Sequence, residues 1–227
     1  MNHTPSQHRA LLECERLEDR LALDATSYVT SLYHNLLMRD PDSSGLSHFV
    51  TEINNGASNA QVANEFWVSP EHRGVEVDAY FQQFLHRSAD PSGRAHWINE
   101  MVNNGVGELQ VAFDFLVSNE FVANHNTPQA YVTGVYLTVL ARLPSNDEQA
   151  FWQDQMARNG IGAVAGGVLT SQEAFTGIIS NDYMTYLNRK PDANGLDAWL
   201  SQLETGRGSV QSVAVGILGS AEYAAKH

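Results

Sequence analysis

The sequence predicts an all-α protein built from four degenerate copies of a helical segment of about 50 residues. Three observations lead to this fold class: a motif that occurs four times, apolar residues at helical spacing around it, and no pair of alternating strands joined by a two-residue turn. Because short links favour packing between copies that follow one another in the chain, we expect a compact double bundle or a short solenoid.

The repeated motif starts at an arginine, and these arginines are 48, 55 and 47 residues apart. An aromatic residue follows ten residues later, a glycine 17 or 18 residues later, and a Ser-x-Glu 29 to 31 residues later. The third copy lacks the aspartate at the third position and the glycine at the sixth position after the arginine. The signature residues are Arg39, Arg87, Arg142 and Arg189; Gly45, Gly93 and Gly195; Phe49, Trp97, Trp152 and Trp199; and Glu71, Glu120, Glu173 and Glu222.

Helix start and stop signals lie between these landmarks. Asp90-Pro91 combines an N-cap residue with proline at the first helical position, and Asn104-Gly105 ends the following apolar pattern. Ser58 with Gln61 predicts a capping box. Ser69-Pro70 is a further N-cap, which starts a short fourth helix or one that runs into the next copy.

The organisation predicted from these signals has three parts. Thr127-Pro128 is the best internal boundary, and it separates a first pair of copies, 26–127, from a second pair, 128–227. Residues 1–25 precede the first copy and are expected to lie outside the fold as a sorting or capping segment.

Composition restricts the function. The chain has 227 residues with 26 acidic and 13 basic side chains, a formal net charge of −13 and no Lys/Arg run, so we expect no nucleic-acid partner. No apolar run is long enough to predict a transmembrane helix, and the charged N-terminus predicts no standard signal peptide. The single cysteine, Cys14, cannot form an intramolecular disulfide.

The acidic loops have two interpretations. Asp40, Asp42 and Ser44 place oxygen ligands at alternate positions, as calcium loops do, and Asp90 and Asp192 recur in other copies. Each loop has at most two carboxylates, so we expect no cofactor beyond weak calcium binding, on the order of 10⁻⁴–10⁻³ M. The structural alternative, which we favour, is that aspartate caps the second helix and the arginine pairs with it or with the Ser-x-Glu carboxylate.

The aromatic and histidine residues also have two interpretations each. The signature tryptophans are expected to be buried in the core of each copy, and a stacking surface for sugars is the less favoured alternative. His96 and Glu100 share a helix face, but without a second histidine we favour a solvated pair over a metal site. No nucleophile elbow, P-loop or dinucleotide motif is present, so no catalytic residue is predicted.

The motif residues carry a family resemblance. The segment 28–46, followed by Asn55-Gly56-Ala57-Ser58 and Ser69-Pro70-Glu71, closely resembles bacterial domain-of-unknown-function family 4214, and the likeness covers residues 26–227. Phe49 stands where that family usually has tryptophan. The resemblance implies an exported or surface-layer-like protein, often found beside calcium-binding repeats, with no established activity. The family is also distantly similar to the helical linker domain of phycobilisome rods.

The N-terminal segment 12–25 carries a second resemblance. Its Leu-Glu-x-Arg string, followed by leucines, looks like the start of planctomycete-type surface proteins, which implies sorting or anchoring. An amphipathic helix that caps the first copy is the alternative interpretation.

Taken with the resemblance, these observations predict a non-enzymatic structural or adhesive module of the bacterial cell surface or extracellular matrix. Its expected partner is another protein or a surface polymer. A calcium-stabilised extracellular module is the first alternative, and an enzyme with a composite site between copies is the second.

Overall fold

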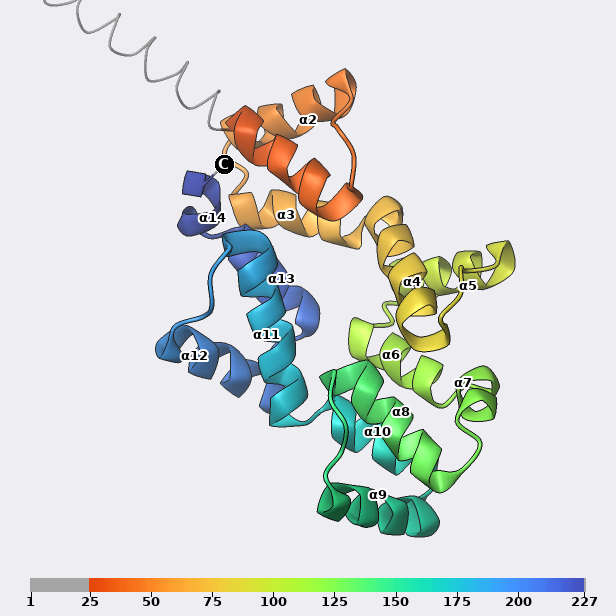
Figure 1. Cartoon of the computed structure of the whole chain (residues 1–227). Coiled ribbons are helices and arrows are strands. Elements are labelled where there is room, and N and C mark those ends of the chain that lie inside the picture. The colour runs from red at the N-terminus through yellow and green to blue at the C-terminus, as the bar shows by residue number, and fades with distance from the viewer. Residues whose placement is uncertain (1–24, 227) are drawn as a thin grey trace, which may run out of the picture. The chain divides into compact units, whose positions relative to one another are not determined.

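The computed structural model describes residues 25–226, and every regular element in this range is an α-helix (Figure 1). The prediction of an all-α fold with repeated helices is therefore confirmed. Of the predicted N-terminal segment, residues 1–24 lie outside the described residues, and Ala25 is buried in the first helix. The helices span residues 25–37, α2 (Ser43–Asn54), α3 (Asn59–Val68), α4 (Pro70–Leu85), α5 (Pro91–Asn103), α6 (Glu108–Leu116), α7 (Asn119–Asn124), α8 (Pro128–Leu140), α9 (Asn146–Asn159), α10 (Ile161–Leu169), α11 (Gln172–Leu187), α12 (Ala193–Glu204), α13 (Val210–Leu218) and α14 (Ala221–Lys226).

Each copy repeats one backbone path. Its first helix ends at a non-glycine residue with φ between 48° and 54°, which stands directly before the signature arginine. A left-handed residue at this position reverses the chain and lets the second helix fold back. A glycine with positive φ then separates the second helix from the third. The four left-handed residues are Met38, His86, Ala141 and Asn188, and the glycines are Gly56, Gly105, Gly160 and Gly206.

The fourth element differs between copies. The Ser-x-Glu serine caps a helix in every copy: Ser69 accepts from the N–H of His72, Ser118 from Phe121, Ser171 from Ala174 and Ser220 from Tyr223. After the first and third copies this helix continues into the next copy and forms the 16-residue α4 and α11. After the second copy it stops as the six-residue α7, because the chain breaks before Pro128, the first residue of α8.

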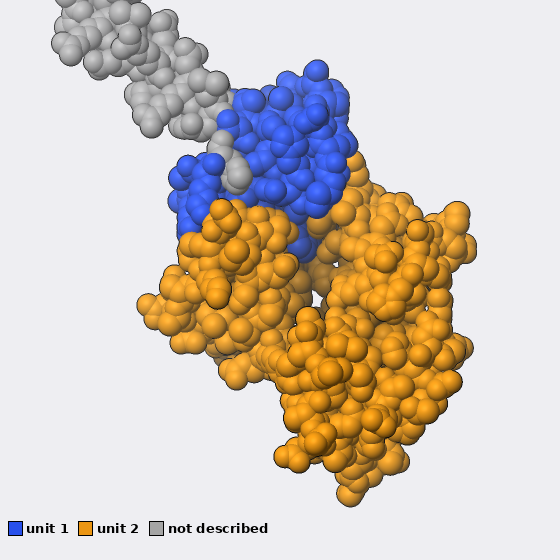
Figure 2. Space-filling view, in the orientation of Figure 1, with its two compact units in different colours: residues 1–67, 215–227 blue, residues 68–214 orange. Residues whose placement is uncertain are grey.

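The described chain divides into two compact units (Figure 2), of which the first contains the described residues 25–67 and 215–226. Within it the two ends of the described chain meet, since the rings of Tyr28 and Tyr223 lie edge to face with centroids 5.8 Å apart. The Tyr28 hydroxyl donates a hydrogen bond to the carbonyl oxygen of Asn59 at 2.7 Å and lies 3.2 Å from that of Leu218. The last copy therefore completes the core around the first helix.

The second compact unit, residues 68–214, contains the same arrangement between α7 and α8. Phe121 and Tyr131 lie edge to face at 5.8 Å, and the Tyr131 hydroxyl lies 3.2 Å from the carbonyl oxygen of Leu116. Thr127-Pro128, the predicted boundary between 26–127 and 128–227, falls inside this unit as the N-cap and first residue of α8. The compact units therefore differ from the predicted pairs of copies, because Tyr131 anchors α8 to the copy before it.

Aromatic packing forms the core of the second unit. Phe115, 3% exposed, lies at its centre, with ring centroids 5.0 Å from Phe81, 5.6 Å from Phe84, 5.4 Å from Trp97 and 6.1 Å from Tyr80. These rings come from α4, α5 and α6, so the second and third helices of one copy close over its first helix.

Candidate functional site

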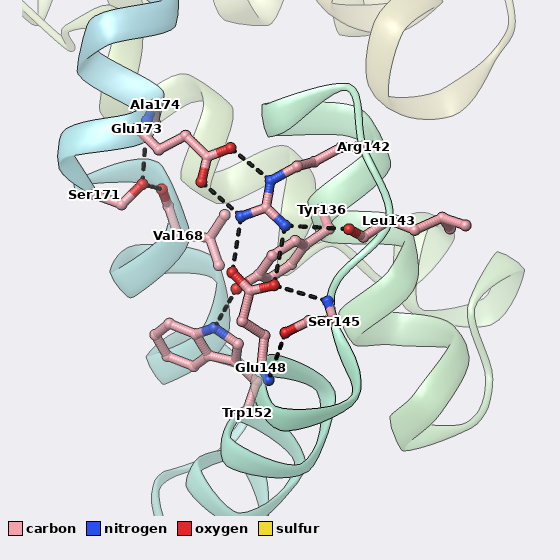
Figure 3. Close-up of polar contacts among 10 residues, drawn as sticks. All are labelled: Tyr136, Arg142, Leu143, Ser145, Glu148, Trp152, Val168, Ser171, Glu173 and Ala174. Atoms are coloured by element: carbon pink, nitrogen blue, oxygen red, sulfur yellow. Dashed lines mark hydrogen bonds and ion pairs between the residues drawn. The ribbon is translucent and has the colours of Figure 1, made fainter.

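The signature arginine is the candidate site that recurs in every copy, and Figure 3 shows it in the third. Arg142 donates from Nε and Nη2 to both oxygens of Glu173, each at 2.6 Å. Nη1 and Nη2 also donate to Glu148 at 2.9 and 2.7 Å, and Nη1 donates to the carbonyl oxygen of Leu143 at 3.1 Å. The guanidinium lies 5.1 Å from the ring centroid of Tyr136. One side chain thus joins the ends of three helices through paired, charge-assisted hydrogen bonds.

The other arginines lie in the same way. Each guanidinium lies 4.8 to 5.0 Å from the centroid of the aromatic ring six residues earlier, at Tyr33, Phe81 and Tyr183. Each also donates from Nη1 to the carbonyl oxygen of the next residue, at 3.0 to 3.1 Å. In the second copy Arg87 holds Glu120 by two bonds of 2.6 and 2.8 Å. Glu71 and Glu222 stand in the first turns of α4 and α14.

The signature glycine and the aromatic ring under the arginine belong to one packing arrangement. A Cβ added to Gly45 would lie 2.0 Å from the Tyr33 hydroxyl oxygen, and one added to Gly195 would lie 2.8 Å from that of Tyr183. The equivalent position in the third copy is Glu148, whose carboxylate pairs with Arg142 and completes a capping box with Ser145. In that copy Ser145 stands at the aspartate position and caps the helix, while Glu148, at the glycine position, supplies the carboxylate that pairs with the arginine.

The predicted calcium ligands belong to three loops, one each in the first, second and fourth copies. One oxygen of Asp42 accepts from the hydroxyl of Ser44 at 2.6 Å and from the N–H of Gly45 at 2.9 Å, and Asp40 lies 2.8 Å from the Nε2 of His34. Asp90 and Asp192 cap α5 and α12 in the same manner. The serine hydroxyl and then the glycine N–H lower the pKa of Asp42 and of Asp90 to about 2. Helix capping therefore explains why an aspartate stands at Asp42, Asp90 and Asp192. Calcium binding stays a prediction.

The cap at Asp90 gives a direct test. Asp90→Ala removes the acceptor of the Gly93 N–H bond of 2.9 Å and is expected to lower the free energy of unfolding by about 1 kcal/mol. Asp90→Asn is expected to cost less, because asparagine caps nearly as well. Urea unfolding followed by circular dichroism measures both. Equal and large losses in the two variants would show instead that the carboxylate charge is essential.

The prediction that the signature tryptophans are buried needs correction. Phe49, Trp97, Trp152 and Trp199 are all only partly buried. The second helix of each copy lies at the edge of the core, and α2 and α9 contain no buried residue. Trp152 instead packs one face on the core and donates its indole N–H to the Tyr136 hydroxyl at 2.8 Å.

A cluster of buried charges in the second compact unit has no counterpart among the sequence predictions. Arg73, 3% exposed, donates from Nη1 to Glu76 at 2.5 Å and to Glu108 at 2.7 Å. Asp182, 8% exposed, has one buried oxygen with no hydrogen-bond partner among the described residues. Asp182 lines a cavity of about 720 Å³, and Glu108 lines one of about 180 Å³. Both cavities are lined by Val139, Ile178 and Val210.

Burial dominates the electrostatics of this cluster. It raises the pKa of Glu76 to about 7 against the opposing effect of Arg73, with Glu108 adding repulsion. It also raises the pKa of Asp182 to about 7, and the charges of Glu108 and Glu76 add to this shift. Glu76 and Glu108 thus share one guanidinium, and Asp182 adds a third carboxyl group whose charge they repel, so the cluster exchanges protons near neutral pH. A charged residue on the apolar face of a helix, as Asp182 is beside Ile179 and Tyr183, was the available sequence signal.

These features define an all-helical repeat protein whose recurring charged residues join its helices. A family model described as "Domain of unknown function (DUF4214)" matches residues 11–75, 77–125, 112–178 and 170–227, so the chain belongs to this family and the resemblance is confirmed. The comparisons with curated proteins and with solved structures gave no match. Among the described residues, no helix is sufficiently long and apolar to cross a membrane.

Proposed function

We propose that this chain is a non-enzymatic structural or adhesive module of the bacterial cell surface or extracellular matrix, and that it acts by contact with another protein or a surface polymer. The observation that carries the proposal is the use of the signature arginines. In every copy the guanidinium stacks on a ring of its own first helix and donates to the next carbonyl. The repeated charges thus serve the scaffold, which leaves recognition to the residues that vary.

Exposed apolar side chains at variable positions support this division of roles. Leu143 is 64% exposed and Phe151 is 54% exposed, both in the third copy. The position of Leu143 holds Asp40, Ser88 and Lys190 in the other copies, and that of Phe151 holds His48, His96 and Ala198. Large exposed apolar residues of this kind are enriched at protein contacts. The surface location rests on the family resemblance, since related domains occur in exported proteins.

Fractionation of the native cells tests this proposal. We expect antibodies against the chain to recover it from the envelope or the medium, cross-linked to a partner. Phe151→Asp is expected to reduce the cross-linked fraction, whereas Ala198→Asp, the same change at the same position of the fourth copy, is expected to leave it unchanged. Circular dichroism checks that both variants fold. Recovery in the cytoplasm alone, or equal loss in both variants, would contradict the proposal.

A further inference from the structure

Three potential ligand groups from two helices meet in the first copy. His48 and Glu52 lie one turn apart on α2, and Glu65 lies on α3. One nitrogen or oxygen atom from each of them lies within 4.8 Å of the others. The Nε2 of His48 is 3.5 Å from Oε1 of Glu52, while Oε2 of Glu52 is buried and has no hydrogen-bond partner among the described residues.

The distances suit a tetrahedral metal ion. Zinc binds imidazole nitrogen and carboxylate oxygen at roughly 2.0–2.2 Å, so two tetrahedral ligand atoms lie roughly 3.4 Å apart. The 3.5 Å between His48 and Glu52 matches this separation. Glu65 is exposed and its ligand atom lies within 4.8 Å of the other two, so a rotation of its side chain can complete the set.

The copies differ at these three positions. The second copy also has a histidine and two acids, His96, Glu100 and Asp114. The third has Phe151, Gln155 and Gly167, and the fourth has Ala198, Gln202 and Gly216. A Cβ on Gly167 would lie 2.3 Å from Trp152, so the third copy packs its tryptophan where the first has Glu65.

In the second copy the two acids of the corresponding set have other partners. Glu100 accepts from Asn104 at 2.9 Å and Asp114 accepts from Gln110 at 2.9 Å, so both acids already have donors. In the first copy, by contrast, the histidine and both acids converge.

We propose that His48, Glu52 and Glu65 bind a divalent transition-metal ion, with Zn²⁺ as the expected metal and water in the remaining position. An imidazole nitrogen favours zinc over calcium, which takes oxygen ligands. Two carboxylates balance the charge of the ion. Because the ligands come from α2 and α3, the bound metal cross-links the second and third helices of the first copy.

Calorimetric titration of the full chain with Zn²⁺ and with Co²⁺ tests the site. We expect His48→Ala and Glu65→Gln each to remove one binding site or to weaken it about tenfold or more, since even outer-shell changes cost 10–100-fold. His96→Ala, the same change in the second copy, is the matched control and is expected to keep the wild-type site count and affinity. Zinc is expected to raise the melting temperature of the wild type and of this control, and to raise that of His48→Ala less.

Two further measurements define the ligands. Co²⁺ is expected to give a visible absorption band that includes a contribution lost in His48→Ala but present in His96→Ala. The proposal is overturned if the wild type and His48→Ala bind the same number of zinc ions with the same affinity. It is also overturned if Ca²⁺ competes with Zn²⁺ at equal concentration, because an all-oxygen site would then account for the binding.

Discussion

Replacing Arg73 by methionine is expected to lower the free energy of unfolding at pH 8 by about 3–5 kcal/mol. The side chain is buried, and its guanidinium donates hydrogen bonds to the carboxylates of Glu76 and Glu108. Methionine fills a similar volume but leaves both carboxylates without a cation in a region of low dielectric constant. Urea denaturation followed by circular dichroism measures the loss.

An exposed arginine supplies the control for this experiment. Arg158 is 70% exposed and pairs with Asp154 one helical turn away, so Arg158→Met is expected to change stability by about 0.5 kcal/mol or less. Adding Glu108→Gln to Arg73→Met is expected to restore part of the loss, because one uncompensated charge disappears. A loss of under about 1 kcal/mol in Arg73→Met would show that water reaches the cluster and solvates it.

Replacing Asp182 by asparagine is expected to raise the free energy of unfolding at pH 8 by about 2–4 kcal/mol. The side chain is 8% exposed, and burial together with Glu108 and Glu76 raises its pKa to about 7. At pH 8 the folded protein therefore holds a charge that the unfolded chain solvates more favourably. Asparagine keeps the shape of the side chain and removes this charge.

The direction of the pH dependence follows from the raised pKa. The folded carboxyl keeps its proton up to about pH 7, whereas the unfolded one loses it near 3.8, so the folded state binds more protons between these values. The stabilising contribution is fully present below the unfolded pKa and is lost as pH rises through 7. The free energy of unfolding should therefore change less between pH 5 and pH 8 in Asp182→Asn than in the wild type. The pH dependence that remains comes from Glu76, whose pKa is also raised.

Asp197→Asn is the matched control for this variant. Asp197 is exposed on α12, so its replacement is expected to leave stability within about 0.5 kcal/mol at every pH. A loss of stability in Asp182→Asn that is equal at pH 5 and pH 8 would show that the carboxylate is needed as an acceptor and would contradict the assigned shift.

Much of the local structure could be predicted from the sequence because it depends on neighbours along the chain. The cap of Asp90 on the N–H of Gly93 and the capping box of Ser58 with Gln61 span three residues each, and both are present. The left-handed residues before each arginine were not predicted. Two of them, Met38 and Ala141, have no intrinsic preference for that conformation, which the packing of the arginine loop imposes.

The candidate sites were predicted less completely. The regular spacing of the repeat identified the signature arginines and glutamates in each copy. It did not show which side of each helix is covered by the core. The second helix lies at the edge, so Trp97 and Trp152 are half-buried although their helical register is that of a core residue. For the same reason the sequence did not predict the proposed metal site, because Glu65 comes from another helix than His48 and Glu52.

By itself the sequence determined the four copies, the helices within them and the caps between residues close together in the chain. Helix start and stop signals and the spacing of a repeat can be recognised in a single sequence, because each depends on residues at fixed separations along the chain. The tertiary structure alone decided which distant residues meet: Tyr28 with Tyr223, and Arg73 with Glu108 beside Asp182. Such pairs depend on the packing angles between helices, which many side chains set together and no short motif records.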